Sequence, residues 1–170
     1  MVRLIRAGFA GAAAGTLGTL AMDLVWYRRY RAGGGTQPFT AWETSEGTKG
    51  YENAAAPART AKAIADMVGV TLPDSSARTV NNVVHWMTGI GWGKAHGLAS
   101  TTLGTSTSLL GPLTGVVAWS TSYVVLPQLG VYKPMGEYDR DVLIQDLTAH
   151  LVYGTVMGVT YRLLSGARRG

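Results

Sequence analysis

Residues 8–22, Gly-Phe-Ala-Gly-Ala-Ala-Ala-Gly-Thr-Leu-Gly-Thr-Leu-Ala-Met, form an uncharged stretch of glycine, alanine and leucine that decides the fold. Apart from Arg6 near its start, the wider segment 4–27 carries a single charge, Asp23, near its end. As a helix, this segment is long enough to cross a hydrocarbon layer of about 30 Å. The sequence therefore predicts a membrane-spanning helix over 4–27.

Three further segments resemble this first one in length and in their shortage of charge. The uncharged segment 108–126 has Pro112 in its first turn and Pro127 directly after its end, which is typical of helix boundaries. The segment 81–103 is the most polar of the three. The sequence thus predicts four spans, at 4–27, 81–103, 108–126 and 142–164.

The composition agrees with a membrane protein and excludes several other classes. Charged residues make up 15% of the 170, against roughly 25% in an average soluble domain. Hydrophobic residues make up 46%, which excludes a disordered chain. The absence of cysteine excludes a disulfide scaffold and thiol chemistry. The net charge of +5 lies in no long basic block, so we interpret it as a membrane-orientation signal and expect no nucleic-acid partner.

Two alternatives to the membrane bundle stay open. Glycine- and alanine-rich helices also occur in soluble cores, and the mean hydropathy of +0.12 is low for a multi-pass protein. Residues 1–21 also resemble a signal peptide, with Arg3 and Arg6 as its basic start. Against the second alternative, the rest of the chain would still contain long uncharged segments.

A polar region, 28–79, separates the first two predicted spans. Glycines at 33–35 form a flexible joint, and turn-rich sequence follows. In 57–70, Ala61, Ile64 and Val68 fall on one helical face, which predicts an amphipathic helix. We expect this helix to pack on the bundle or to lie at the lipid headgroups.

An internal repeat connects the spans in pairs. Residues 85–100 and 150–165 both follow the pattern H-x3-G-x3-G-x4-L-x-S. The spans that precede these two segments, 4–27 and 108–126, each contain a pair of glycines four residues apart. The pairs are Gly11 with Gly15 and Gly111 with Gly115. Two such hairpins would lie parallel, related by an axis along the membrane normal. The predicted fold is therefore all-α, a single membrane domain over 1–170 with a four-helix transmembrane bundle of two parallel helical-hairpin repeats and a short amphipathic helix in the long first loop.

Small residues on the predicted spans indicate close helix packing, because glycine lets helix backbones approach one another in a membrane. The predicted packing positions are Gly11, Gly15, Gly18, Gly89, Gly93, Gly154 and Gly158. These are more small-residue faces than one bundle needs internally. We therefore also predict a homo-oligomer or a larger membrane protein complex.

The predicted topology collects polar side chains at one membrane face, where the first span ends and the second and fourth begin. This polar layer consists of Asp23, Asn81, Asn82, His85, Tyr123, Asp146 and His150. Ionisable residues inside a membrane are costly and are therefore candidates for function. Histidine and asparagine can equally serve as hydrogen bonds between helices. A helix contact, a proton or ion path, and a ligand site stay open as uses of this layer.

No catalytic motif accompanies the polar layer, because the sequence contains no nucleophile elbow, phosphate loop or HExxH motif. The leading hypothesis is a structural or accessory membrane subunit without a cofactor. The first alternative is a small proton, ion or solute transporter. The second is a haem bound by His85 and His150, or zinc or manganese bound by these histidines with Asp23 and Asp146.

Several short motifs resemble an uncharacterised family of bacterial, largely actinobacterial, multi-pass membrane proteins, related more distantly to the YagU-like inner-membrane proteins. The motifs are Asn81-Asn-Val-Val-His85-Trp86, Gly91-Trp-Gly93, Tyr132-Lys-Pro134, Glu137-Tyr-Asp139 and Asp146-Leu-Thr-Ala-His150-Leu-Val-Tyr-Gly154. The resemblance implies a multi-pass helical protein of the bacterial plasma (inner) membrane. It brings no activity and no catalytic residue. Lysine and arginine divide evenly between the two predicted sides, so the sequence does not decide the orientation.

Overall fold

Helices make up the fold, and no strand occurs among the residues that the computed structural model describes, 1–103 and 109–166. The four long helices are α1 (Val2–Ala32), α4 (Ala77–Thr102), α5 (Leu110–Gln128) and α6 (Arg140–Ser165). The connections contain the short helices α2 (Phe39–Glu43) and α3 (Ala56–Met67) and the 3₁₀ turns η1 (Asp74–Ser76) and η2 (Met135–Glu137). The prediction of an all-α fold is confirmed.

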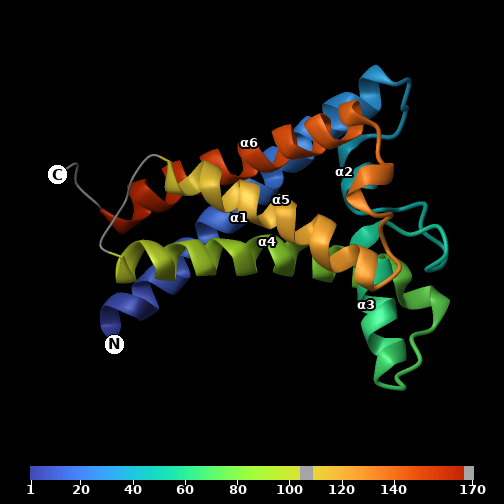
Figure 1. The fold of residues 1–170 in the computed structure, drawn as a ribbon, viewed down its shortest axis with the longest axis horizontal. Helices are drawn as coiled ribbons and strands as arrows, with labels where there is room; N and C mark the ends of the chain where they lie inside the picture. Colours follow the sequence, from blue (N-terminus) through green and yellow to red (C-terminus); the bar gives the residue numbers. More distant parts are fainter. Residues whose placement is uncertain (104–108, 167–170) are drawn as a thin grey trace.

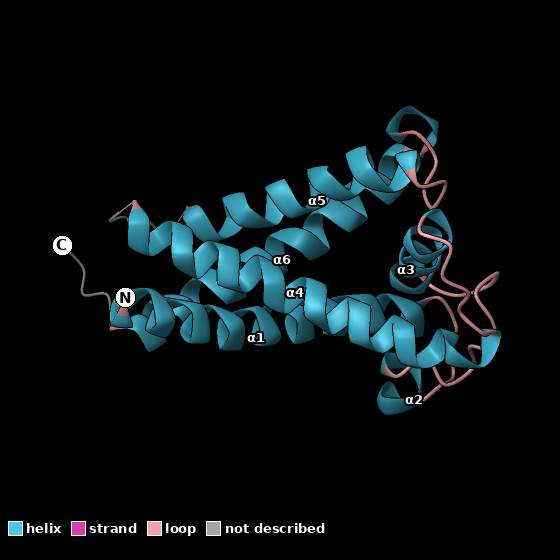
Figure 2. Ribbon diagram, turned by 90° about the horizontal axis from the view of Figure 1, so that it is seen from below, coloured by secondary structure: helices cyan, strands magenta, loops and turns pink. Residues whose placement is uncertain are grey.

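The central helix is α1, which packs along α4 on one side and along α6 on the other. Helix α5 packs mainly on α6. The four long helices run lengthwise through the molecule, and α2 and α3 gather with their loops at one end (Figure 1). We call this end, residues 33–76 and 129–139, the cap. The same division into bundle and cap is visible after a 90° turn (Figure 2).

Glycines bring the backbone of α1 into contact with both of its neighbours. A Cβ atom at Gly93 of α4 would overlap the carbonyl oxygen of Gly11 and would lie 2.6 Å from Cα of Gly15. A Cβ atom at Gly18 would lie 2.8 Å from the carbonyl oxygen of Tyr153 on α6. The glycine stripe of α1 therefore divides between two helices, with its first two members against α4 and its third against α6.

The pair of α5 and α6 is packed in the same way. A Cβ atom at Gly154 would overlap the carbonyl oxygen of Gly111 and would lie 2.9 Å from the backbone nitrogen of Gly115. A Cβ atom at Gly111 would in turn lie 2.9 Å from Cα of Gly158. These separations are below the 3.4 Å at which ordinary contacts begin, so only glycine allows either helix pair to pack this closely.

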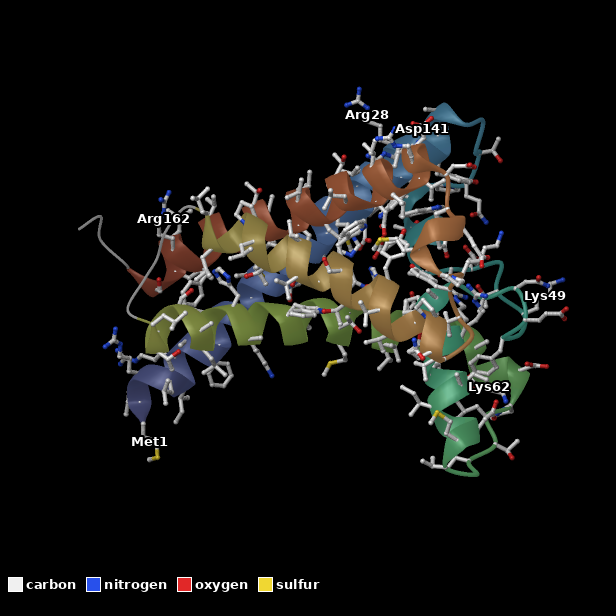
Figure 3. The ribbon with its side chains drawn as sticks, viewed as in Figure 1. Met1, Arg28, Lys49, Lys62, Asp141 and Arg162 are labelled. Atoms are coloured by element: carbon white, nitrogen blue, oxygen red, sulfur yellow. The ribbon has the colours of Figure 1, made fainter. Side chains whose placement is uncertain are left out.

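The bundle buries several polar groups beside an apolar cluster around Met157, and many large apolar side chains lie on its outside. Thr19, Asp23, Asn81, His96 and Ser100 are buried. The outer surfaces of the long helices expose side chains that a soluble protein would bury, among them Phe9, Leu17, Leu24, Val83, Met87, Leu113, Val117, Val124, Ile144 and Leu163. The labelled charged residues lie at the ends of the bundle, Arg162 at the end that holds Met1, and Arg28, Lys49, Lys62 and Asp141 at or near the cap (Figure 3).

Two of the long helices, α1 and α6, are long and apolar enough to cross a membrane by length and composition. The structure thus shows an all-helical bundle with two candidate spans. The finer expectation of four spans stays a prediction. Each predicted span nevertheless corresponds to one long helix, although Ser108, the predicted first residue of the third, lies outside the described residues. The predicted amphipathic helix 57–70 is α3, and the predicted turn region before it contains the additional helix α2.

Candidate functional site

An ion pair between α1 and α4 lies at the cap end of the bundle. His85 Nε2 is 2.9 Å from Asp23 Oδ2. Asp23 is 3% exposed, whereas the His85 side chain keeps 25% of its surface accessible. A carboxylate with so little access to water is costly unless a partner compensates its charge, and His85 is that partner.

The short helix α2 adds a second carboxylate to this pair. One ligand-type atom from each of Asp23, Glu43 and His85 lies within 4.8 Å of the others. Glu43 Oε1 is buried and has no hydrogen-bond partner. We call these three residues the acidic triad. Two carboxylates and one imidazole thus converge on a small volume between α1, α2 and α4.

Aromatic packing fixes α2 against the end of α1. The ring of Tyr27 packs edge-on against Phe39 at 5.2 Å and lies 5.5 Å from Trp42. The Tyr30 hydroxyl accepts a hydrogen bond from the backbone N–H of Gln37 at 3.1 Å. Helix α2 has only five residues, too few to be stable alone, so these contacts with α1 hold it in place.

The residues after Glu43 are held by two asparagines of the predicted polar layer. Ser45 ends α2 with a left-handed φ of 50°, a conformation that usually requires glycine. Its hydroxyl accepts a hydrogen bond from Asn81 Nδ2 at 2.9 Å. Asn82 Nδ2 donates to the Thr44 carbonyl oxygen, also at 2.9 Å. Asn81 and Asn82 therefore position the turn that carries Glu43.

The environment of Glu43 disfavours its ionised form. Burial, and then the neighbouring Asp23 carboxylate, raise the pKa of Glu43 to about 7. A positive charge placed between the carboxylates would offset their repulsion and compensate their removal from water. The triad is therefore suited to hold a cation as well as a proton.

A second polar cluster lies where α5 and α6 meet the cap. His150 Nδ1 is 2.9 Å from the backbone oxygen of Asp146 and 3.3 Å from its Oδ1, so this pair lies within one helix. Tyr123 lies beside Asp146 and packs against the rings of Tyr132 at 5.5 Å and Tyr138 at 5.3 Å.

The structure thus places the predicted polar-layer residues in two clusters. Asp23, Asn81, Asn82 and His85 surround α2, and Tyr123, Asp146 and His150 lie on the other helix pair. The two histidines have different partners, because His85 pairs with Asp23 on α1 and His150 pairs with Asp146 on its own helix. A haem or a metal shared by His85 and His150 stays a prediction.

Two further polar residues, Glu43 and His96, lie in the interior although they were not part of the predicted polar layer. Glu43 belongs to a region predicted as turns, and its only sequence signal is a charge beside Trp42. His96 is buried, and its Nδ1 lies 3.0 Å from Thr114 Oγ1 on α5. The sequence already places His96 on the same helical face as His85, although about three turns away from the predicted polar layer.

Comparisons with protein families, with curated proteins and with solved structures found no match to this chain.

Proposed function

We propose that this chain is a four-span membrane protein that passes a cation across the bilayer, with the acidic triad as its binding site. The membrane part of the proposal is supported by the exposed apolar side chains along α1, α4, α5 and α6. Lys94 is a charged side chain exposed among these apolar ones. It lies two turns from the end of α4, where its long side chain can reach the lipid headgroups. A signal peptide is disfavoured, because its removal would take away the central helix.

Cysteine labelling tests the four spans against a two-span topology, since every introduced cysteine is unique in this chain. With four spans, Leu103→Cys should react with an impermeant maleimide from the same side as Ser165→Cys. Lys49→Cys and Lys133→Cys should react from the opposite side, because both lie in the cap. With only α1 and α6 across the membrane, Leu103→Cys would instead react from the cap side.

The membrane location itself has a simpler control. The unlabelled protein should stay in the pellet after alkaline carbonate extraction, because four apolar helices would lose their lipid contacts in water. Release into the supernatant would contradict the membrane proposal.

The single observation that carries the cation function is the acidic triad at the membrane end of a lipid-facing bundle. Ionisable side chains in such positions are costly and mark ion pathways in many membrane proteins. The triad holds two carboxylates against one imidazole, so its charge is best balanced by a bound cation.

Polar groups also lie at intervals in the interior between the triad and the other end of the bundle. On α4 the buried polar side chains extend from Asn81 to Ser100, about 28 Å at 1.5 Å per residue, which matches the hydrocarbon thickness. Between them, the Tyr153 hydroxyl donates to a carbonyl oxygen of α4 at 2.7 Å, and His96 meets Thr114. We propose that a cation leaving the triad passes these groups on its way through the bundle.

Flux into liposomes tests this function. Purified protein reconstituted with an entrapped pH dye or a divalent-sensitive dye should give cation entry above that of protein-free liposomes. Asp23→Asn should lower the rate at least tenfold, because it removes the buried charge while keeping the shape of the side chain. Lys94→Leu, which changes an exposed charge outside the triad, is the matched control and should keep the rate.

Two results would contradict the cation function. One is entry no faster than in protein-free liposomes. The other is an Asp23→Asn rate equal to that of the unmodified protein, with both proteins equally helical by circular dichroism.

The structural or accessory role predicted from glycine-rich faces has less support than the cation function. The predicted packing glycines lie against other helices of the same chain. Among the described glycines of the long helices, Gly8 and Gly91 face open space. A homo-oligomer or a larger complex would therefore have to pack through the exposed apolar side chains instead.

A further inference from the structure

The acidic triad combines ligand types that select one class of cation. Asp23 and Glu43 offer carboxylate oxygens and His85 offers an imidazole nitrogen. Calcium and magnesium bind through oxygen, calcium with six to eight ligands, whereas an imidazole with carboxylates suits zinc, manganese and related metals. The presence of His85 therefore points away from the alkaline-earth ions.

The spacing of the three side chains suits such a metal after a small adjustment. Zinc binds carboxylate and imidazole ligands at about 2.0–2.2 Å, which sets tetrahedral ligand atoms about 3.3–3.6 Å apart. His85 Nε2 and Asp23 Oδ2 are 2.9 Å apart, and the triad atoms lie within 4.8 Å of one another. A metal would lengthen the first separation slightly and shorten the widest.

One oxygen of the third ligand, Glu43, has no hydrogen-bond partner in the part of the chain that the structure describes. Glu43 Oε1 is buried without a hydrogen-bond partner, although buried carboxylate oxygens are normally paired. The strained turn at Ser45 and the hydrogen bonds from Asn81 and Asn82 maintain this arrangement. Such strain is commonly found next to binding sites.

We propose that Asp23, Glu43 and His85 bind one divalent first-row transition metal ion, of the zinc or manganese type, with a further position left open to water. This inference rests on the proposed cation function and names its ion. Three protein ligands with an open fourth position allow the ion to be exchanged, unlike a closed structural site with four protein ligands. Asn81 and Asn82 act as positioning residues, because they hold the turn that presents Glu43.

Direct metal binding tests the proposal without any transport measurement. Purified protein in detergent is treated with a chelator, desalted, and titrated with zinc or manganese, with the bound metal counted by mass spectrometry. We expect one ion per chain. Glu43→Gln should weaken binding by more than the roughly 10–100-fold that loss of an outer partner typically costs a metal site. Glu46→Gln, an exposed carboxylate three residues later, is the matched control and should bind as the unmodified protein does.

Further measurements decide the remaining outcomes. Cobalt should give a visible absorption spectrum that Glu43→Gln abolishes and Asn81→Ala shifts, with unchanged helicity by circular dichroism in both variants. Equal zinc binding by Glu43→Gln and the unmodified protein would overturn the proposal, as would tighter binding of calcium. Metal binding without liposome flux would overturn the transport function alone, and flux of protons without metal binding would overturn the metal site alone.

Discussion

Replacing Gly93 with alanine is expected to destabilise the bundle by about 3 kcal/mol or more, although the change adds a single methyl group. That methyl would overlap the carbonyl oxygen of Gly11 and would lie 2.6 Å from Cα of Gly15. Both atoms belong to the backbone of α1, which cannot turn aside as a side chain can. Overpacking of a tight contact typically costs about 1–3 kcal/mol, and separation of the two helices would also lose the Asp23–His85 ion pair.

Gly91 supplies a matched control two residues away on the same helix. A Cβ atom at Gly91 meets nothing within 4 Å, and alanine has a helix propensity about 1 kcal/mol better than that of glycine. Gly91→Ala should therefore be neutral or stabilising. Thermal unfolding in detergent, followed by circular dichroism and size-exclusion chromatography, measures both variants. Equal melting temperatures for the two variants would show that α1 and α4 do not meet at their glycines.

Replacing His85 with leucine is expected to cost about 3–5 kcal/mol in metal-free buffer. The substitution leaves Asp23, which is 3% exposed, without its partner, and an uncompensated buried charge is strongly destabilising. The double variant Asp23→Leu/His85→Leu should recover most of this loss, because it removes both charges and fills the space with apolar atoms. Loss of helicity with increasing denaturant gives the free energy of unfolding of the unmodified protein, of both single variants and of the double variant. These four values give the coupling energy between the two side chains.

The double-variant cycle separates the ion pair from simple packing. If the losses of the two single variants add up in the double variant, the two side chains do not interact. A recovered double variant would also lack two of the three metal ligands, so it should be stable and yet bind no zinc. That combination distinguishes a structural failure from a failure of binding.

The long helices could be predicted from the sequence because a shortage of charge over about twenty residues is a local property. Segments 4–27 and 142–164 correspond to α1 and α6 within a few residues, except that α1 continues to Ala32. The extension of α1 places Tyr30 on the helix, where it packs against α2 beside Tyr27. The position of α2 depends on those tertiary contacts, so no local pattern predicts it.

The sequence could also predict which helix ends lie at the same end of the bundle. It could not predict which of these helices are neighbours. Counting residues along each span placed Asp23, His85 and His150 at one end of the bundle, and the structure places the end of α1 and the starts of α4 and α6 there. Which helices are neighbours depends on packing at the glycines. His85 pairs with Asp23 on α1, whereas His150 pairs with Asp146 on its own helix, so the histidines belong to different clusters. Glu43 reaches Asp23 from the short helix α2.

The position of α1 between α4 and α6 has a consequence for the biosynthesis of the protein. If the chain enters a membrane as proposed, neither packing partner of α1 exists when α1 is made, and its glycine stripe and Asp23 then face lipid or the insertion machinery. The first partner, α4, arrives after the cap segment, and α6 arrives last. The central helix is therefore made first, and it stays incompletely covered until α6 has been synthesised.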